Sequence, residues 1–127
     1  MPNEAINPDT VYRGLGYSHA YKAGNVIYLC GQAPFDKDHN IVGKGDFLAQ
    51  AMQAFENMKL TLEGAGAAMS DIVKLGFWVT DYDQMSKIGP VYEKYLTPPF
   101  PAALGVEISR HPEPDIMIQV HGIAVIE

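Results

Sequence analysis

The stretch from Phe47 to Leu62 carries apolar side chains at the spacing of an α-helix, and this stripe constrains the fold more than any other feature. The apolar face consists of Phe47, Leu48, Ala51, Met52, Phe55, Met58 and Leu62. Asp46 is a suitable N-cap, and Gly64 and Gly66 predict the end of the helix. Because such a face has to be buried, we expect the helix to pack against a sheet.

Four runs rich in β-branched and aromatic residues predict the strands of that sheet. They are residues 26–30, 72–79, 102–109 and 116–126. A second helix is expected to begin within residues 81–86, with Met85, Ile88, Val91, Tyr92 and Tyr95 on one side. Pro90 is compatible with that helix only if the helix starts late, and Pro98 and Pro99 predict its end.

The order of these elements predicts an α+β fold, with a mixed β-sheet and two helices on one face. The other face of the sheet then needs a cover, and self-association with closed cyclic symmetry is the simplest one. No internal repeat, low-complexity tract or linker interrupts the chain, so residues 1–127 are expected to form a single domain.

Charge and cysteine content disfavour several kinds of function. The 9 Lys and Arg residues against 15 Asp and Glu give a net charge of -6 without a basic cluster, which disfavours nucleic-acid binding. Cys30 is the only cysteine, so the chain has no internal disulfide and suits a reducing compartment. No secretory signal and no apolar run of roughly 18 residues are present, so we expect a cytoplasmic protein without membrane contact.

Four segments stand in an order and spacing that a known family shares. They are Gly16-Tyr17-Ser18-His19-Ala20 leading to Ala23-Gly24-Asn25, Cys30-Gly31-Gln32-Ala33-Pro34, Leu62-Glu63-Gly64-Ala65-Gly66 followed by Asp71-Ile72-Val73-Lys74, and Phe100-Pro101-Ala102 with Ile123-Ala124. Together they resemble the Rid family (reactive intermediate deaminase, historically YjgF). No single segment is specific, but the resemblance covers residues 16–126.

The resemblance implies the chorismate-mutase-like α+β fold. It also implies a homotrimer in which three sheets form a central barrel, with the helices outside and three clefts between neighbouring subunits. Typical members hydrolyse reactive enamines and imines, such as 2-aminoacrylate, to keto acids and ammonium, without a metal or organic cofactor. The expected partners are a small-molecule substrate and two further copies of the chain.

The same resemblance suggests the catalytic residues. Tyr17 matches a tyrosine whose hydroxyl lines the cleft, and Gly31 matches a backbone contact; a packing aromatic and a conformational glycine are the alternatives. Gln119 stands where the family has a water-positioning glutamate, but a neutral amide cannot act as a base. His19 could move protons instead, because it shares a face with Tyr17 if the segment is extended. A hydrogen-bonded structural histidine is the alternative for His19, and it is the favoured interpretation of His121.

The arginine on which the family's chemistry depends is absent. In the family motif Pro-Ala-Arg-Ser, the arginine grips the substrate carboxylate with two hydrogen bonds. The motif reads Pro101-Ala102-Ala103-Leu104 here, so Ala103 stands at the arginine position. Leu104 and Gly105 replace small polar or thiol-bearing residues, and a family asparagine falls on Gly89. We expect Ala103, Leu104 and Gly105 to contact substrate and Phe100 to wall the cleft.

Arginine, cysteine and histidine residues are further candidates for a role in the same cleft. Arg13 or Arg110 could supply a displaced cation, although solvation at the surface is the default for both. Cys30 could be a nucleophile, but no activating base is evident and a buried thiol is the better interpretation. Four histidines without a close carboxylate or cysteine partner predict no metal site.

Three functions remain open from the sequence. The first is hydrolytic deamination of a small enamine, imine or related C–N intermediate, with a non-standard substrate because the carboxylate anchor is missing. The second is a non-catalytic trimer that binds a ligand or a partner protein. The third is a different reaction in the same cleft, such as hydration, dehydration or cyclisation. Fold alone does not choose among them, because function resides in the site.

Overall fold

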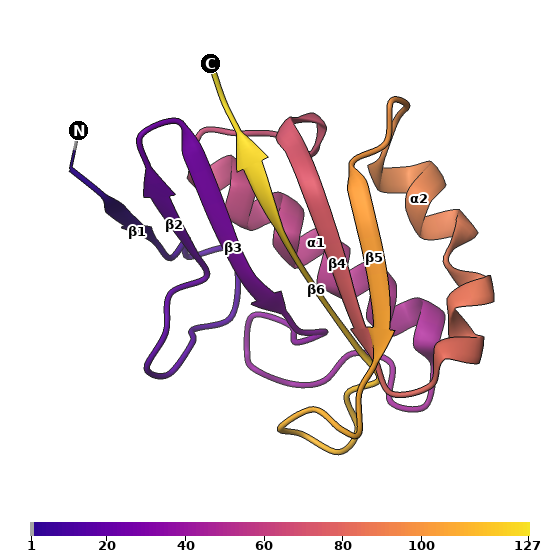
Figure 1. Cartoon of the computed structure of the whole chain (residues 1–127). Helices are drawn as coiled ribbons and strands as arrows, with labels where there is room; N and C mark the ends of the chain where they lie inside the picture. Colours follow the sequence, from indigo (N-terminus) through magenta and orange to yellow (C-terminus); the bar gives the residue numbers. More distant parts are fainter. Residues whose placement is uncertain (1) are drawn as a thin grey trace.

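The computed structural model describes residues 2–127 and shows one six-stranded sheet with helices packed on one face (Figure 1). The strands are β1 (Glu4–Ile6), β2 (Ala20–Ala23), β3 (Val26–Gln32), β4 (Ile72–Val79), β5 (Ala102–Glu107) and β6 (Ile118–Val125). The helices are α1 (Phe47–Gly64) and α2 (Gly89–Tyr95), with 3-10 turns at Met69–Asp71 and Tyr82–Lys87. The predicted α+β fold is confirmed.

The last strand lies in the centre of the sheet. The strand order is β1-β2-β3-β6-β4-β5, so β6 pairs antiparallel with both β3 and β4. The edge strand β5 is parallel to β4, and the remaining pairs are antiparallel. This order places Gln119 of β6 opposite Trp78 of β4, close to the end of β3.

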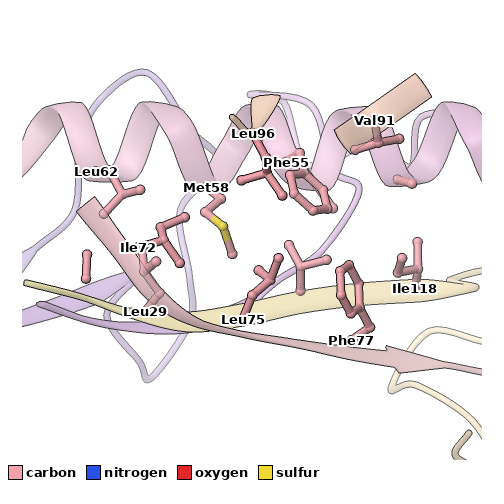
Figure 2. Close-up of a cluster of buried hydrophobic side chains, with 14 of the residues drawn as sticks. Leu29, Phe55, Met58, Leu62, Ile72, Leu75, Phe77, Val91, Leu96 and Ile118 are labelled. Carbon is pink, nitrogen blue, oxygen red and sulfur yellow. The ribbon is translucent and has the colours of Figure 1, made fainter. Parts of the chain in front are cut away.

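Helix α1 forms where the apolar stripe predicts it. The Asp46 carboxylate accepts a hydrogen bond from the backbone N–H of Ala49 at 3.1 Å, which satisfies one free donor of the first turn. Phe55 and Met58 are fully buried between α1 and the sheet, in the cluster that Figure 2 shows. Each such side chain contributes about 1.5–3 kcal/mol by leaving water.

The second helix differs from the expectation in where it begins. The chain forms a 3-10 helix at Tyr82–Lys87, and the α-helix starts only at Gly89, with Pro90 in its first turn. Proline has no N–H to donate and its ring clashes with the carbonyl four residues earlier, so one continuous α-helix cannot pass through it. The sequence pattern also gives no indication of β1, which is only three residues long.

The face of the sheet away from the helices is apolar and uncovered in the single chain. Phe77 points to the helices and is buried, whereas its neighbour Trp78 points to this open face, as strand alternation requires. Tyr28, Leu104 and Val106 are also exposed on it, and Leu104 is 70% exposed. An apolar surface of this kind is typical of an interaction face.

Within residues 2–127, no helix combines the length and the apolar character that a membrane crossing requires.

Candidate functional site

A pocket of about 400 Å³ opens where β3 ends and β6 begins. Loops made of residues 7–19, 33–46 and 108–117 lie around these strand ends, in the lower part of Figure 1. The walls include Tyr12, Tyr17, Gly31, Phe35, Glu113 and Gln119. The structure therefore brings Tyr17, Gly31 and Gln119 together from three distant segments. Their catalytic roles remain predictions.

A β-bulge shapes the floor of the pocket. Leu29 pairs with Gly122 and Gln32 with Val120, so two residues of β3, Cys30 and Gly31, stand opposite one residue of β6. A bulge of this kind interrupts the ladder and turns backbone groups away from it. The Cys30 thiol lies 3.6 Å from the carbonyl oxygen of Gly31 as a weak donor.

Gly31 leaves the space that the Gln119 amide occupies. A Cβ atom at Gly31 would collide with Oε1 of Gln119 and would lie 3.2 Å from the Trp78 ring. The amide therefore lies directly against the Gly31 backbone, which explains why a side chain is excluded at this position. An amide oxygen and a backbone carbonyl oxygen at one wall can accept two hydrogen bonds from the same water molecule.

Tyr17 stands half exposed at the pocket mouth. A Cβ atom built at Gly14 would come within 2.6 Å of Cε2 of Tyr17, so the Tyr17 ring lies directly over Gly14. Burial raises the pKa of the Tyr17 phenol above its ordinary value. The hydroxyl therefore stays protonated around pH 7 and is able to donate a hydrogen bond.

His19 takes a different place from the one the sequence suggests. Its ring is only 1% exposed, and Nδ1 lies 3.0 Å from Oε1 of Gln32 while Nε2 lies 2.6 Å from the carbonyl oxygen of Tyr12. The His19 and Tyr17 rings are 6.2 Å apart, but His19 does not line the pocket, because residues 17–19 precede β2 and are not strand. The structure supports the alternative of a hydrogen-bonded structural histidine.

His121 also lies outside the pocket, although it shares a strand face with Gln119 as expected. Its imidazole stacks on the Trp78 ring with centroids 4.0 Å apart. The imidazole also lies against Gly76, where a Cβ atom would collide with it. Burial, with a smaller effect from Lys74, lowers the pKa of His121 below its ordinary value. The ring is therefore neutral around pH 7.

The β5 residues lie apart from the pocket in a single chain. Ala103 pairs with Leu75 of β4, and the whole of β4 separates β5 from Gln119 on β6. Leu104 points to the open face, whereas Gly105 faces Tyr82 on the opposite side. Phe100 packs against Tyr92 with ring centroids 5.7 Å apart. None of the four expected contact residues of this segment lines the pocket, so they could join it only from another copy of the chain.

The two arginines considered as displaced anchors also lie outside the pocket. Arg13 lines a neighbouring hollow together with Lys37 and Asp9. Arg110 donates hydrogen bonds to the backbone carbonyls of His111 and Pro112, at 3.1 and 2.9 Å. No Lys or Arg stands among the pocket residues in the described part of the chain.

In residues 2–127, no group of three His, Cys, Asp or Glu side chains could hold a metal ion.

Sequence reasoning missed several wall residues, of which Tyr12 is the most buried. The Tyr12 hydroxyl accepts a hydrogen bond from the backbone N–H of Ala33 at 3.1 Å, and its ring packs edge-on against Phe35 at 5.0 Å. Glu113, in the loop before β6, falls in a proline-containing turn for which the sequence pattern predicts no role. A charged residue between two prolines just before the Gln119 strand was the available signal.

The comparison with known proteins settles the family. A family model described as endoribonuclease L-PSP matches residues 10–126. The crystal structure of RidA from an Antarctic Psychrobacter aligns with a TM-score of 0.89, covering 97% of this chain and 99% of that chain at 32% identity. This chain belongs to the Rid family.

Two Rid-family relatives extend the comparison over the whole chain. The chain is 37% identical to a RutC family protein of Pyrococcus abyssi, over 100% of both chains. It is 34% identical to the 2-iminobutanoate/2-iminopropanoate deaminase of Dermatophagoides farinae, over 99% of this chain and 98% of the relative. Deaminases of small imines therefore occur among its relatives.

The environment of Cys30 makes it a poor nucleophile. Burial raises the pKa of the Cys30 thiol to about 11. The thiolate is the reactive species, so alkylation by iodoacetamide at pH 8 should be about 100-fold slower than that of a free-cysteine peptide. The rate should keep rising up to about pH 11. A rate that levels off near pH 8 would contradict this, and Cys30→Ser provides the unlabelled control.

Helix α1 holds the pocket wall in place through Asn57. This buried amide donates hydrogen bonds to the carbonyl oxygens of Ala33 and Phe35, both at 2.9 Å. Asn57→Ala should lower the free energy of unfolding by about 1–3 kcal/mol. The Ala33 carbonyl would lose the Asn57 donor, and the Phe35 carbonyl would keep only the longer side-chain hydrogen bond from Gln53, at 3.3 Å. It should also speed amide hydrogen exchange in residues 33–42. Lys59→Ala is the control, because Lys59 lies on the same helix and forms ion pairs with Glu56 and Glu63 of that helix. Equal effects of both changes would refute the role of Asn57.

Proposed function

We propose that this Rid-family protein hydrolyses a small imine or enamine that carries no carboxylate anchor, in the pocket formed by Tyr17, Gly31 and Gln119. The observation that carries the proposal is the composition of the pocket wall, which includes one carboxylate, the imidazole of His39, and no lysine or arginine among the described residues. With Ala103 at the arginine position, nothing in the chain matches the family's grip on a substrate carboxylate.

The pocket supplies hydrogen bonds rather than a strong base. In the proposed reaction, water adds to the imine carbon, the electron pair of the C=N bond moves to nitrogen, and nitrogen gains a proton. The resulting carbinolamine expels ammonia and leaves a carbonyl compound. The Gln119 amide oxygen and the Gly31 carbonyl oxygen accept hydrogen bonds from the attacking water, and the Tyr17 hydroxyl donates one to the substrate.

The cleft is proposed to lie between subunits of a homotrimer. The uncovered apolar face with Tyr28, Trp78 and Leu104 supports association through the sheets. Such an assembly would also allow β5 of one copy to approach the pocket of another. Sedimentation should give three times the chain mass of 13.9 kDa. A stable monomer would contradict the proposal of an intersubunit cleft.

RNA is not the proposed substrate, although the matching family model is described as an endoribonuclease. The net charge of -6 disfavours binding of a phosphate backbone. The pocket wall also lacks the cations that phosphate contacts require.

Ammonia release from imines generated in the assay tests the proposal. The panel pairs 2-aminoacrylate with carboxylate-free imines of similar size, such as those of simple aldehydes. We expect faster release from the carboxylate-free group, with losses of tenfold or more in Tyr17→Phe and Gln119→Ala. Faster turnover of 2-aminoacrylate than of every neutral imine would contradict the proposal. Binding without any turnover would favour the non-catalytic trimer instead.

A further inference from the structure

Glu113 contributes the one carboxylate among the described residues of the pocket wall, which holds no lysine or arginine and one imidazole, that of His39. It lies in the loop between β5 and β6, between Pro112 and Pro114. The family resemblance assigns it no role, and the proposed mechanism does not use it. A carboxylate on the wall of a mainly aromatic and apolar pocket sets the sign of the charge that the pocket accepts.

The Glu113 carboxylate has no cationic partner within residues 2–127. The ion pairs join Lys44 to Asp115 at 3.6 Å, and Lys59 to two carboxylates of α1. The guanidinium of Arg110, in the same loop, is engaged by backbone carbonyls. The negative charge of Glu113 is therefore available to a ligand.

The loop holds Glu113 in a defined place. His111 on one side is buried, with Nε2 3.0 Å from the carbonyl oxygen of Trp78. On the other side, the backbone N–H of the buried Ile116 donates to the carbonyl oxygen of Glu113 at 3.1 Å. The two prolines fix their own φ angles and limit the loop further. The backbone that carries the exposed Glu113 side chain is therefore fixed at both sides.

The aromatic walls favour the same kind of ligand. Tyr17 lines the pocket with Glu113 and has an accessible ring, whereas Tyr12 and Phe35 form the buried part of the same wall. The face of an aromatic ring attracts cations. Aromatic rings with a single carboxylate are the chemistry that recognises an ammonium or iminium group. A carboxylate ligand would instead meet like charge, with no lysine or arginine on the described wall to offset it.

We propose that Glu113 selects ligands that carry a cationic nitrogen, and that the substrate binds as its protonated imine. The inference rests on the proposed function, because it names the charge class of the substrate for that same pocket. Protonation makes the imine carbon more electrophilic, and a nearby carboxylate stabilises the protonated form. Water addition then converts the iminium to a carbonyl compound, with ammonium or an amine as the nitrogen product.

Binding of stable probes tests the inference without any chemistry. The probes are butylammonium, 1-butanol and butyrate, measured by calorimetry, with amide NMR shifts of residues 30–35 to locate the bound probe. The parent protein should bind butylammonium at least tenfold more tightly than 1-butanol, and should bind butyrate most weakly. Glu113→Gln should weaken butylammonium binding about tenfold and leave 1-butanol binding unchanged.

Asp115→Asn is the matched control, since this carboxylate lies in the same loop but pairs with Lys44 and does not line the pocket. It should leave all three affinities unchanged. The inference is wrong if butyrate binds as tightly as butylammonium, or if Glu113→Gln changes the butylammonium affinity less than twofold. Normal butylammonium selectivity without ammonia release from any imine would sustain the role of Glu113 and refute the deaminase proposal. Ammonia release that does not depend on Glu113 would do the reverse.

Discussion

An Ala103→Arg variant is expected to deaminate 2-aminoacrylate with a KM about 100-fold lower than that of the parent protein. A guanidinium can make two charge-assisted hydrogen bonds to a carboxylate, each contributing about 1.5–3 kcal/mol. Tenfold in affinity corresponds to about 1.4 kcal/mol, so two such bonds account for 100-fold or more. Ala103 is exposed on the edge strand β5, which leaves room for the longer side chain.

Ala103→Lys is the matched control for this change. It adds the same charge, but a lysine ammonium cannot form the two-pronged contact, so its gain should be clearly smaller. Steady-state kinetics of ammonia release separate the two variants. If the parent protein already turns over 2-aminoacrylate as fast as Ala103→Arg, then the absence of the arginine does not determine substrate choice.

A Gly122→Ala variant should lose about 3 kcal/mol or more of its unfolding free energy. Gly122 lies at the centre of the sheet, where β6 pairs with Leu75 of β4 and Leu29 of β3. A Cβ atom there would collide with the carbonyl oxygen of Lys74 and lie 3.7 Å from the Cα atom of Leu75. Because the obstacle is backbone, relief requires separating two paired strands, which puts the cost at the upper end of overpacking effects.

Gly89→Ala provides the control for Gly122→Ala. Nothing lies within 4 Å of a Cβ atom built at Gly89, the first residue of α2. Alanine there should leave stability unchanged or raise it by about 0.4–1 kcal/mol, because it restricts the unfolded chain. Urea unfolding at one fixed protein concentration measures both variants. Equal stability of the two variants would show that β4 and β6 can separate at little cost.

Local sequence pattern was sufficient for the main elements of the fold. The stripe from Phe47 to Leu62 and the cap at Asp46 depend on residues within one helical turn of each other, so both could be predicted. The placement of Phe77 and Trp78 on opposite faces follows from strand alternation alone. The family resemblance rested on short motifs in order, and the match over residues 10–126 confirmed it.

The candidate site was only partly accessible from the sequence. Tyr17, Gly31 and Gln119 could be named by resemblance, and the structure places all three on one pocket. The burial of His19 could not be predicted, because it depends on Gln32 and Tyr12, which reach it from two other segments. Its two-residue spacing from Tyr17 has no meaning outside a strand.

The sequence by itself determined helix α1 and the four longer strands, and which face of each is buried, because those properties depend on near neighbours along the chain. The tertiary structure alone decided that β6 lies between β3 and β4, and that a bulge at Gly31 opens the floor of a pocket. It also decided that Glu113 faces that pocket without a cationic partner among residues 2–127. Strand order and register join segments far apart in the sequence, and no local periodicity records which segments will meet.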